Sequence, residues 1–253
     1  MSLELGIYKG DSLDYALADG YFRMGNDIFT TNEVFVGNYG KSAIYDPVFW
    51  LRLNLKKAKE TATTKRIRKK CARFSFTIQE AVITEEIEVL YAQYLASVNF
   101  DGYPSCKGCI PEVNTPSSVF ETYMINVFDQ SKLIAVAFFD IGLQSLMSVL
   151  HFYHPSYKRF SLGKFLMLIT RQFAMDSKMD FVYPGYFTID GTKMDYKIFP
   201  QKEAMEVFLS KDKCWVPLEN YTKAELEDYY FKQVLGIDFE EMGNEFREPE
   251  NEN

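Results

Sequence analysis

One carboxylate stands in the most apolar stretch of this 253-residue sequence. Asp140 lies in the run Ala135–Ile141, in which every other side chain is apolar. A carboxylate is costly to bury in such surroundings without a partner or a purpose. Asp140 is therefore a candidate general base or an anchor for an amine. The alternative is an aspartate that simply starts a turn before Gly142.

Two histidines, the only ones in the chain, follow in the next apolar run. Residues two apart on an extended strand share a face, so His151 and Tyr153 point to one side and His154 to the other. This spacing does not predict a two-histidine metal site, and we expect each histidine to be packed or on the surface. Tyr153, His151 and His154 could each donate to an oxyanion or a leaving group, and of the three we take Tyr153 as the catalytic candidate.

The net charge of -7 is unevenly distributed along the chain. Seven acids and one base lie between Asp238 and Asn253, a tail that we expect to be disordered. The segment Lys56–Arg73 instead holds nine bases and one acid, a local charge of +8. Such a segment can bind phosphates whatever the total charge is. A solvated helix or loop face is the open alternative.

A second basic segment directly precedes a predicted helix. Lys158-Arg159-Phe160-Ser161-Leu162-Gly163 leads into residues 161–178, where apolar side chains recur at helical spacing. Unpaired N–H groups at the start of a helix bind phosphate or carbonyl oxygens. An ordinary N-cap would give the same pattern, so this alternative stays open.

Hydrophobic periodicity predicts an α+β fold. The first 55 residues favour short strands, residues 83–97 a helix that begins after Thr84, and the glycines and prolines of 102–116 a linker or loop. Further along, the pattern predicts an antiparallel meander, a helix, a strand and a second helix, over 120–128, 133–141, 145–153, 161–178, 181–186 and 202–209.

A meander, a loop, a helix and a diverging strand resemble the core of GNAT-type acyltransferases, a mostly antiparallel sheet flanked by helices. The usual donor loop of that superfamily, Gln/Arg-x-x-Gly-x-Gly/Ala, is matched here only by Gly163 and the helix that follows. We expect a GNAT-like domain over 113–236, a smaller N-terminal α+β region over 1–112 and an acidic tail over 237–253.

A more particular resemblance lies in five segments that follow one another in order. Residues 133–141, 148–155, 161–163, 183–186 and 193–197 resemble the C-terminal catalytic region of the arginyl/leucyl-tRNA-protein transferases. The likeness spans residues 117 to about 200. It extends more weakly to Gly20–Asn26 and to the basic run. It implies transfer of Arg or Leu from tRNA to the N-terminal amine of proteins with acidic N-termini, which tags them for degradation.

The resemblance and the residue types together give a set of candidate site residues. An aminoacyl ester is already activated, so the protein must mainly align the amine and stabilise the oxyanion, and no cofactor is implied. An acidic acceptor needs a cation, although the same cations could hold the 3′-terminal phosphates of the tRNA. The candidates are: for catalysis Asp140, Tyr153 and Tyr186; for the donor Lys158, Arg159, Ser161, Leu162, Gly163 and Lys164; for the acceptor Lys193, Met194, Tyr196 and Lys197; for the tRNA backbone Lys65, Arg66, Arg68, Lys69 and Lys70.

Two other hypotheses stay open: a GNAT enzyme that uses acyl-CoA, and a relative that binds tRNA or acidic N-termini without catalysis. The donor also stays open, because arginine would require an acidic pocket and leucine an apolar one. The expected partners are aminoacyl-tRNA and acceptor proteins that begin with Asp or Glu, with neither membrane nor DNA.

Four cysteines are too few for a disulfide scaffold, and no stretch approaches a membrane helix or a signal peptide, so we expect a cytoplasmic protein. Cys106 and Cys109 form a CxxC, but Cys71 and Cys214 do not supply the second pair of a four-thiolate metal site. The family usually carries paired cysteines near the N-terminus. Val36–Ser42 has none, so control through a metal, cluster or haem at such cysteines should be absent.

Overall fold

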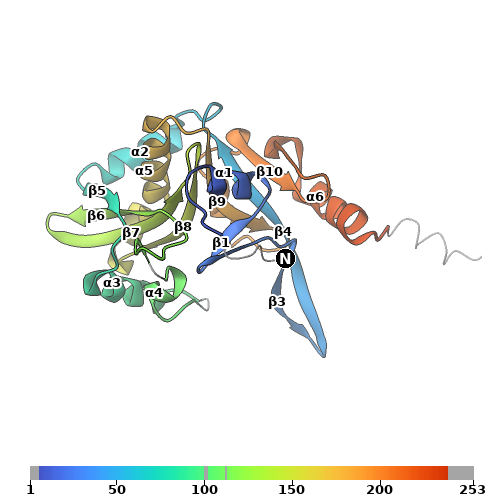
Figure 1. Ribbon diagram of the computed structural model, residues 1–253, viewed down its shortest axis with the longest axis horizontal. Helices are drawn as coiled ribbons and strands as arrows, with labels where there is room; N and C mark the ends of the chain where they lie inside the picture. Colours follow the sequence, from blue (N-terminus) through green and yellow to red (C-terminus); the bar gives the residue numbers. More distant parts are fainter. Residues whose placement is uncertain (1–5, 100–101, 112, 239–253) are drawn as a thin grey trace, which may run out of the picture.

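A computed structural model describes residues 6–99, 102–111 and 113–238. One large sheet forms its centre, with strands in the order β11-β10-β4-β9-β8-β7-β6-β5 and with β3 paired to β4 (Figure 1). Every pairing is antiparallel except that of β8 with β9. Its strands are β3 (Glu33–Tyr39), β4 (Ser42–Asn54), β5 (Ser75–Glu80), β6 (Thr122–Asp129), β7 (Lys132–Ile141), β8 (Ser145–Tyr153), β9 (Phe181–Thr188), β10 (Met205–Leu209) and β11 (Cys214–Pro217).

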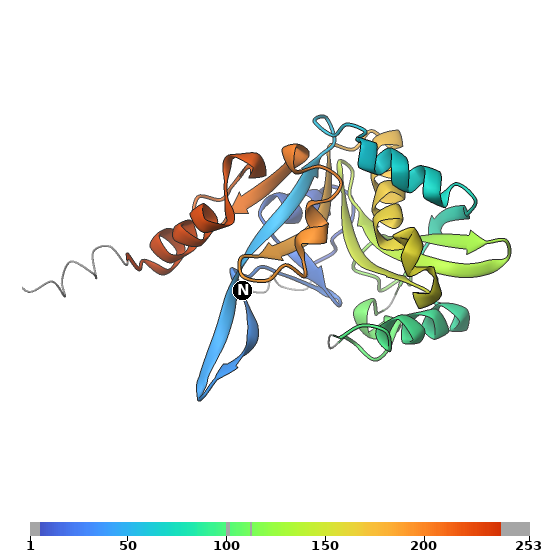
Figure 2. The ribbon, with the colours of Figure 1, turned by 180° about the vertical axis from the view of Figure 1, so that it is seen from behind.

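Helices cover both faces of this sheet (Figures 1 and 2). One face packs against α2 and α5, and the other against α1, α3, α4 and a hairpin of β1 and β2. The helices are α1 (Asp11–Ala18), α2 (Ala62–Cys71), α3 (Glu85–Leu95), α4 (Cys106–Cys109), α5 (Leu162–Asp176) and α6 (Lys223–Tyr229), and the hairpin strands are β1 (Phe22–Met24) and β2 (Asp27–Phe29). Short turns of other helix types are η1 (Pro155–Phe160), η2 (Asp195–Ile198), η3 (Lys202–Ala204), η4 (Leu218–Asn220) and η5 (Tyr230–Leu235).

The α+β class and the mostly antiparallel sheet flanked by helices confirm the coarse prediction. The three predicted runs form the meander β6-β7-β8. The pattern of residues 161–178 forms α5, whose buried residues include Leu162, Phe165, Leu166 and Ile169. The helix α3 begins where Thr84 predicts, and the Thr84 hydroxyl accepts a hydrogen bond from the Ile87 N–H.

The separation of β8 from β9 is the feature that positions the site. The two strands pair in parallel only over Ser145–Met147 and Phe181–Tyr183. Beyond Tyr183, β9 continues along β4, where Trp50 pairs with Tyr186. The strands therefore open toward their C-terminal ends, and the space between them is available for other side chains.

The helix predicted over 202–209 is wrong. A single 3-10 turn, η3, is followed by the strand β10, which pairs with β4 on one side and β11 on the other. All five residues of β10 are buried, including Glu206, which pairs with Arg52 and Lys57. The strand therefore lacks the alternation of buried and exposed side chains by which a strand is recognised in a sequence. The helix α1 was not predicted, and the expected loop over 102–116 contains the short helix α4.

The sheet takes strands from both sides of residue 112, since β3, β4 and β5 precede it and six strands follow it. The proposed division there stays a prediction. Most of the acidic tail, residues 239–253, lies outside the described residues. None of the helices in the described part of the chain is both long and apolar enough to span a membrane.

Candidate active site

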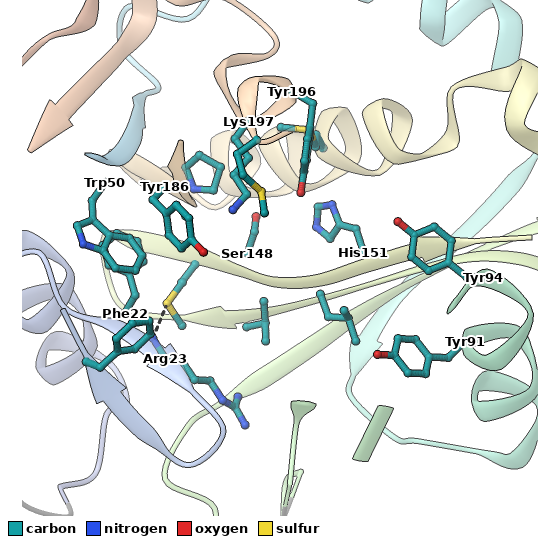
Figure 3. Close-up of a pocket in the computed structure, with 18 of the residues that line it drawn as sticks. Phe22, Arg23, Trp50, Tyr91, Tyr94, Ser148, His151, Tyr186, Tyr196 and Lys197 are labelled. Carbon is teal, nitrogen blue, oxygen red and sulfur yellow. Dashed lines mark hydrogen bonds between the residues drawn. The ribbon is translucent and has the colours of Figure 1, made fainter. Parts of the chain in front are cut away.

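A cavity of about 340 Å³ lies where β8 and β9 separate (Figure 3). Trp50 and Tyr186 stand at one end of it and Tyr91 and Tyr94 at the other, with Lys197 between them. Its lining is mainly aromatic and aliphatic, and consists of Phe22, Arg23, Phe29, Trp50, Tyr91, Tyr94, Leu95, Met147, Ser148, Val149, Leu150, His151, Met167, Pro184, Gly185, Tyr186, Met194, Tyr196 and Lys197. No Asp or Glu is among these described lining residues.

The ammonium of Lys197 is the principal polar group of the cavity. Its Nζ lies 4.6 Å from the centre of the Tyr186 ring, and it makes no ion pair with any of the described residues. Burial lowers the pKa of Lys197 to about 8, because desolvation disfavours the charged form. Gly185 makes room for this ammonium: its φ is +101°, and a Cβ there would lie 2.9 Å from Nζ.

His151 also lines the cavity, beside Lys197 and below Tyr196 in Figure 3. Its Nε2 is buried and has no hydrogen-bond partner among the described residues. Burial, with a smaller contribution from Lys197, lowers the pKa of His151 to about 4, so the imidazole is neutral near pH 7. The sequence interpretation named His151 among the groups that could donate, but it preferred a packed or surface position for this histidine and chose Tyr153 as the catalytic candidate.

The loop after β9 carries the acceptor candidates and is held at its start by a buried carboxylate. Asp46 accepts hydrogen bonds from the backbone N–H groups of Ile189, Asp190 and Gly191 at 3.0 to 3.1 Å. Lys223 donates to the Gly191 carbonyl at 3.0 Å and pairs with Asp195 at 3.1 Å. These contacts fix the path of the chain into η2.

Three of the four acceptor candidates line the cavity: Met194, Tyr196 and Lys197. Lys193 is exposed and does not line it. Among the catalytic candidates only Tyr186 reaches the cavity. Tyr153 does not line the cavity, but its ring lies 5.4 Å from that of Tyr94, which does.

Asp140 is fully buried in β7 and does not line the cavity. Its Oδ1 accepts a hydrogen bond from Arg23 Nη1 at 2.8 Å and another from the Thr122 hydroxyl at 2.6 Å. Burial raises the pKa of Asp140, while Arg23 and Thr122 oppose that shift. Arg23 itself lines the cavity and lies over the Phe120 ring. This geometry indicates that the Asp140 carboxylate positions Arg23. It does not favour the two other roles considered for Asp140, which are to start a turn or to contact a substrate.

The donor candidates lie around the start of α5. Lys158 and Arg159, in η1, and Lys164, in the first turn of α5, are exposed. Ser161 has a φ of +59° and its side chain does not cap the helix, so the ordinary side-chain N-cap, the open alternative for this segment, is not formed. A Cβ on Gly163 would lie 3.7 Å from the Tyr153 ring. Leu162 is buried in the core.

The basic run forms α2 and its flanks, and the structure divides its cations into two groups. Lys56, Lys57, Arg68 and Arg73 pair with Asp180, Glu206, Glu60 and Asp129. Lys59, Lys65, Arg66, Lys69 and Lys70 are exposed and make no ion pair with the described residues. Of the five tRNA candidates, Arg68 alone forms an ion pair with a described residue, Glu60.

The basic helix packs beside the donor segment. Cys71, at the end of α2, donates from its thiol to the Phe160 carbonyl at 3.4 Å, and the Phe74 and Phe160 rings lie 5.0 Å apart. The cations of α2 and of η1 therefore belong to neighbouring elements on the α5 face of the sheet.

The CxxC thiols lie apart from these groups. Cys106 is buried and Cys109 half-buried in α4, and all four cysteines are free. Within residues 6–99, 102–111 and 113–238, no three His, Cys, Asp or Glu side chains are arranged to hold a metal ion.

The fold and the cavity define an α+β protein with an aromatic, cation-bearing pocket between separating strands. Residues 85–205 match the family described as arginine-tRNA-protein transferase, C terminus. The resemblance to the arginyl/leucyl-tRNA-protein transferases is thereby confirmed over this part of the chain.

Curated relatives carry a more specific name. The chain is 27% identical over 144 residues to an aspartate/glutamate leucyltransferase of Teredinibacter turnerae, covering 54% of this chain and 59% of the relative. It is 32% identical over 116 residues to one of Shewanella sp. strain ANA-3, covering 45% and 48%. The matches thus span about half the length of these relatives.

Among solved structures, the C-terminal domain of a putative lysylphosphatidylglycerol synthetase from Agrobacterium fabrum has a TM-score of 0.42 at 12% identity. The match covers 55% of this chain and 47% of that one.

Proposed function

We propose that this protein is an aminoacyl-tRNA-protein transferase that moves leucine from tRNA to the N-terminal amine of polypeptides beginning with Asp or Glu. The single observation that carries the proposal is the ammonium of Lys197, held without a counter-ion among the described residues in an aromatic cavity. The names of the curated relatives support the same reaction.

Lys197 supplies the recognition of an acidic acceptor. The side-chain carboxylate of an N-terminal Asp or Glu would form a charge-assisted hydrogen bond with Nζ, and such bonds are about twice as strong as neutral ones. The bound carboxylate also offsets the cost of keeping this ammonium in an apolar cavity. An acceptor with a neutral side chain gains neither contribution.

Leucine is the donor that suits the cavity better than arginine. The described lining carries aliphatic and aromatic side chains together with the cations of Arg23 and Lys197, and it contains no Asp or Glu. A guanidinium would be desolvated there beside like charges, which costs several kcal/mol. The apolar side chain of leucine is stabilised by the same surroundings.

The proposed architecture is GNAT-like. Its support is the parallel pairing of β8 with β9 over three residues, their separation beyond Tyr183, and the cavity at that opening. In this arrangement the first-turn N–H groups of α5, with Lys158 and Arg159, hold the 3′ end of the tRNA. We propose that residues 113–236 supply most of the catalytic part and residues 1–112 the tRNA contacts of α2.

The reaction is aminolysis of an ester. The acceptor α-amine, with a pKa of about 7.7 to 8.0, is partly neutral near pH 7. It attacks the ester carbonyl, a C–N bond forms, and the bond to the ribose oxygen breaks. The proton of the amine leaves and the ribose oxygen is protonated. The protein contributes alignment of the two substrates, and the Tyr186 hydroxyl can donate to the developing oxyanion.

The test is a transfer assay with the whole purified protein. tRNA carrying labelled Leu or labelled Arg is incubated with peptides that begin with Asp, Glu or Ala, and the label in the peptide is measured. We expect label from leucyl-tRNA only, and in the Asp and Glu peptides only. Absence of transfer with either donor, from protein shown by circular dichroism to be folded, would contradict the proposal. Labelled acetyl transfer from acetyl-CoA would favour the acyl-CoA alternative.

A further inference from the structure

A two-stranded ribbon projects from the sheet beside the cavity region. Residues 33–46, comprising β3 and the start of β4, extend away from the other strands (Figures 1 and 2). Five large apolar side chains on this ribbon are 42 to 82% exposed: Phe35, Val36, Tyr39, Ile44 and Tyr45. An isolated pair of strands is marginally stable in water, and a cluster of exposed apolar side chains on one element is typical of an interaction surface.

The ribbon offers both side chains and backbone groups to a partner. Phe35 lies opposite Tyr45, and their rings are 5.9 Å apart. β3 pairs only with β4 among the described strands, so its outer edge lacks a strand partner there. The bulge between Phe35 and Gly37 interrupts that edge. The apolar side chains, with a few backbone hydrogen bonds beside them, would therefore supply most of the contact.

The ribbon is continuous with the wall of the cavity. Its second strand, β4, carries Asp46 at the base of the ribbon and Trp50 in the cavity lining. Asp46 holds the loop that leads to Lys197 through three backbone N–H groups. The Tyr230 hydroxyl donates to the Glu33 carboxylate at 2.6 Å and fixes the other strand at its base. A chain bound on the ribbon would thus be held at a fixed distance from the site.

Charge selects a polypeptide rather than a nucleic acid as the occupant. Residues 33–46 contain one base, Lys41, against the acids Glu33 and Asp46. Binding to a phosphate backbone depends on several cations, and the unpaired cations of the basic helix lie on α2. An acceptor polypeptide must instead leave the cavity as an extended chain, for which apolar side chains are suitable partners.

We propose that the β3–β4 ribbon binds the segment of the acceptor polypeptide that follows its N-terminal residue. This inference rests on the proposed function, because it takes the acceptor N-terminus to lie in the cavity. The seven residues of β3 span about 23 Å at roughly 3.3 Å per residue. The ribbon is thus long enough to contact several successive residues of an extended acceptor, and it selects acceptors whose first segment is unfolded and apolar.

The test compares two acceptors in the transfer assay with the full-length protein. One is the dipeptide amide Asp-Ala, and the other is a 12-residue peptide that begins with Asp and has apolar residues at positions 3 to 7. The ribbon variants are Tyr39→Ser and the double variant Phe35→Ser/Tyr45→Ser. Tyr15→Ser is the matched control, because Tyr15 is 72% exposed on α1. Circular dichroism establishes that each variant is folded.

We expect KM for the long peptide to rise about five- to tenfold in the ribbon variants, as for removal of one or two interface anchors. KM for the dipeptide and the affinity for tRNA should not change, and the control should match the wild type. Equal rises in KM for both acceptors together with weaker tRNA binding would overturn the proposal in favour of nucleic acid. Unchanged KM, with a dimer in sedimentation that the ribbon substitutions dissociate, would overturn it in favour of a second copy.

Failure of the proposed function is distinguishable from failure of this inference. Fluorescence anisotropy of the labelled long peptide measures ribbon binding without any transfer. A wild-type protein that binds this peptide through the ribbon but transfers nothing contradicts only the enzymatic assignment. A wild-type protein that transfers leucine, with ribbon variants that bind the long peptide as tightly as the wild type, contradicts only the docking surface.

Discussion

The fully buried charge of Asp140 and the half-buried charge of Lys197 have different environments and therefore different expected roles. Asp140 is paired with Arg23 and separated from the cavity, whereas Lys197 lines the cavity and lacks a carboxylate partner among the described residues. The sequence indicated that a carboxylate buried in such an apolar run must have a polar partner or a functional role. It could not identify Arg23, 117 positions away, because that contact depends on how β1 packs on the sheet.

The substitution Asp140→Asn should lower the free energy of unfolding by about 3 kcal/mol, because it leaves the Arg23 guanidinium, 2% exposed, without its counter-charge. Urea unfolding measures this change. Thr122→Val is the control and should cost less, about 2 kcal/mol, because it removes the two hydrogen bonds of the Thr122 hydroxyl, to Asp140 and from Arg23, but keeps the charge pair. An Asp140→Asn protein of wild-type stability that has no transfer activity would instead identify Asp140 as the base.

Lys197→Met should raise the free energy of unfolding at pH 7 by about 1 to 3 kcal/mol. The folded-state pKa of about 8 lies below the ordinary value of 10.5. Between these two values the unfolded chain binds more protons, so wild-type stability rises with pH across this window. The advantage of the variant should therefore shrink as pH approaches 10.5. A constant difference from pH 7 to 10.5 in urea unfolding would show that Lys197 is not desolvated.

At the scale of elements, local patterns and long-range pairing differ in what a sequence reveals. The meander and α5 follow from periods of 2 and 3.6 residues and were predicted. The opening between β8 and β9 arises because β9 stays paired with β4 along its length but separates from β8 after Tyr183, and no local pattern encodes this separation. β10 was mistaken for a helix because all five of its residues are buried and their burial does not alternate along the strand.

The element-scale prediction concerns the exposed cations of α2. A four-site variant should bind tRNA more weakly than the wild type; it carries the substitutions Lys65→Ala, Arg66→Ala, Lys69→Ala and Lys70→Ala. The slope of log K against log salt should also fall in magnitude, by about 0.7 to 0.9 for each phosphate that is no longer neutralised. Filter binding at several salt concentrations measures the slope. Lys56→Ala/Lys57→Ala removes cations that pair with Asp180 and Glu206 and should change the slope much less. Equal slopes for the four-site variant and the wild type would exclude α2 from tRNA binding.

At the scale of the whole molecule, one sheet joins the two parts that the sequence separated at residue 112. The glycines and prolines of 102–116 indicated a linker or loop between two parts of the chain, but they do not reveal that β4 lies between β9 and β10. Phe49, Leu51 and Leu53 of β4 share a core with residues of α5 and β7. The N-terminal residues thus complete the core of the C-terminal ones.

We therefore expect the fragment 113–253 not to fold alone, because removal of β4 leaves β9 and β10 without their shared partner. The intact chain should unfold in a single transition with coincident circular dichroism and fluorescence signals. A fragment with a cooperative transition of its own would show that residue 112 is a true domain boundary.

The measurement that tests the central claim most directly is the ratio of single-turnover leucine transfer to peptides that begin with Asp and with its uncharged isostere Asn. In the wild type this ratio should be at least about tenfold, the equivalent of one charge-assisted hydrogen bond. In Lys197→Met it should fall to near one, while the rate with the Asn peptide changes little. A ratio that survives the removal of the Lys197 ammonium would contradict the assignment of this group, and of this cavity, to the acidic acceptor.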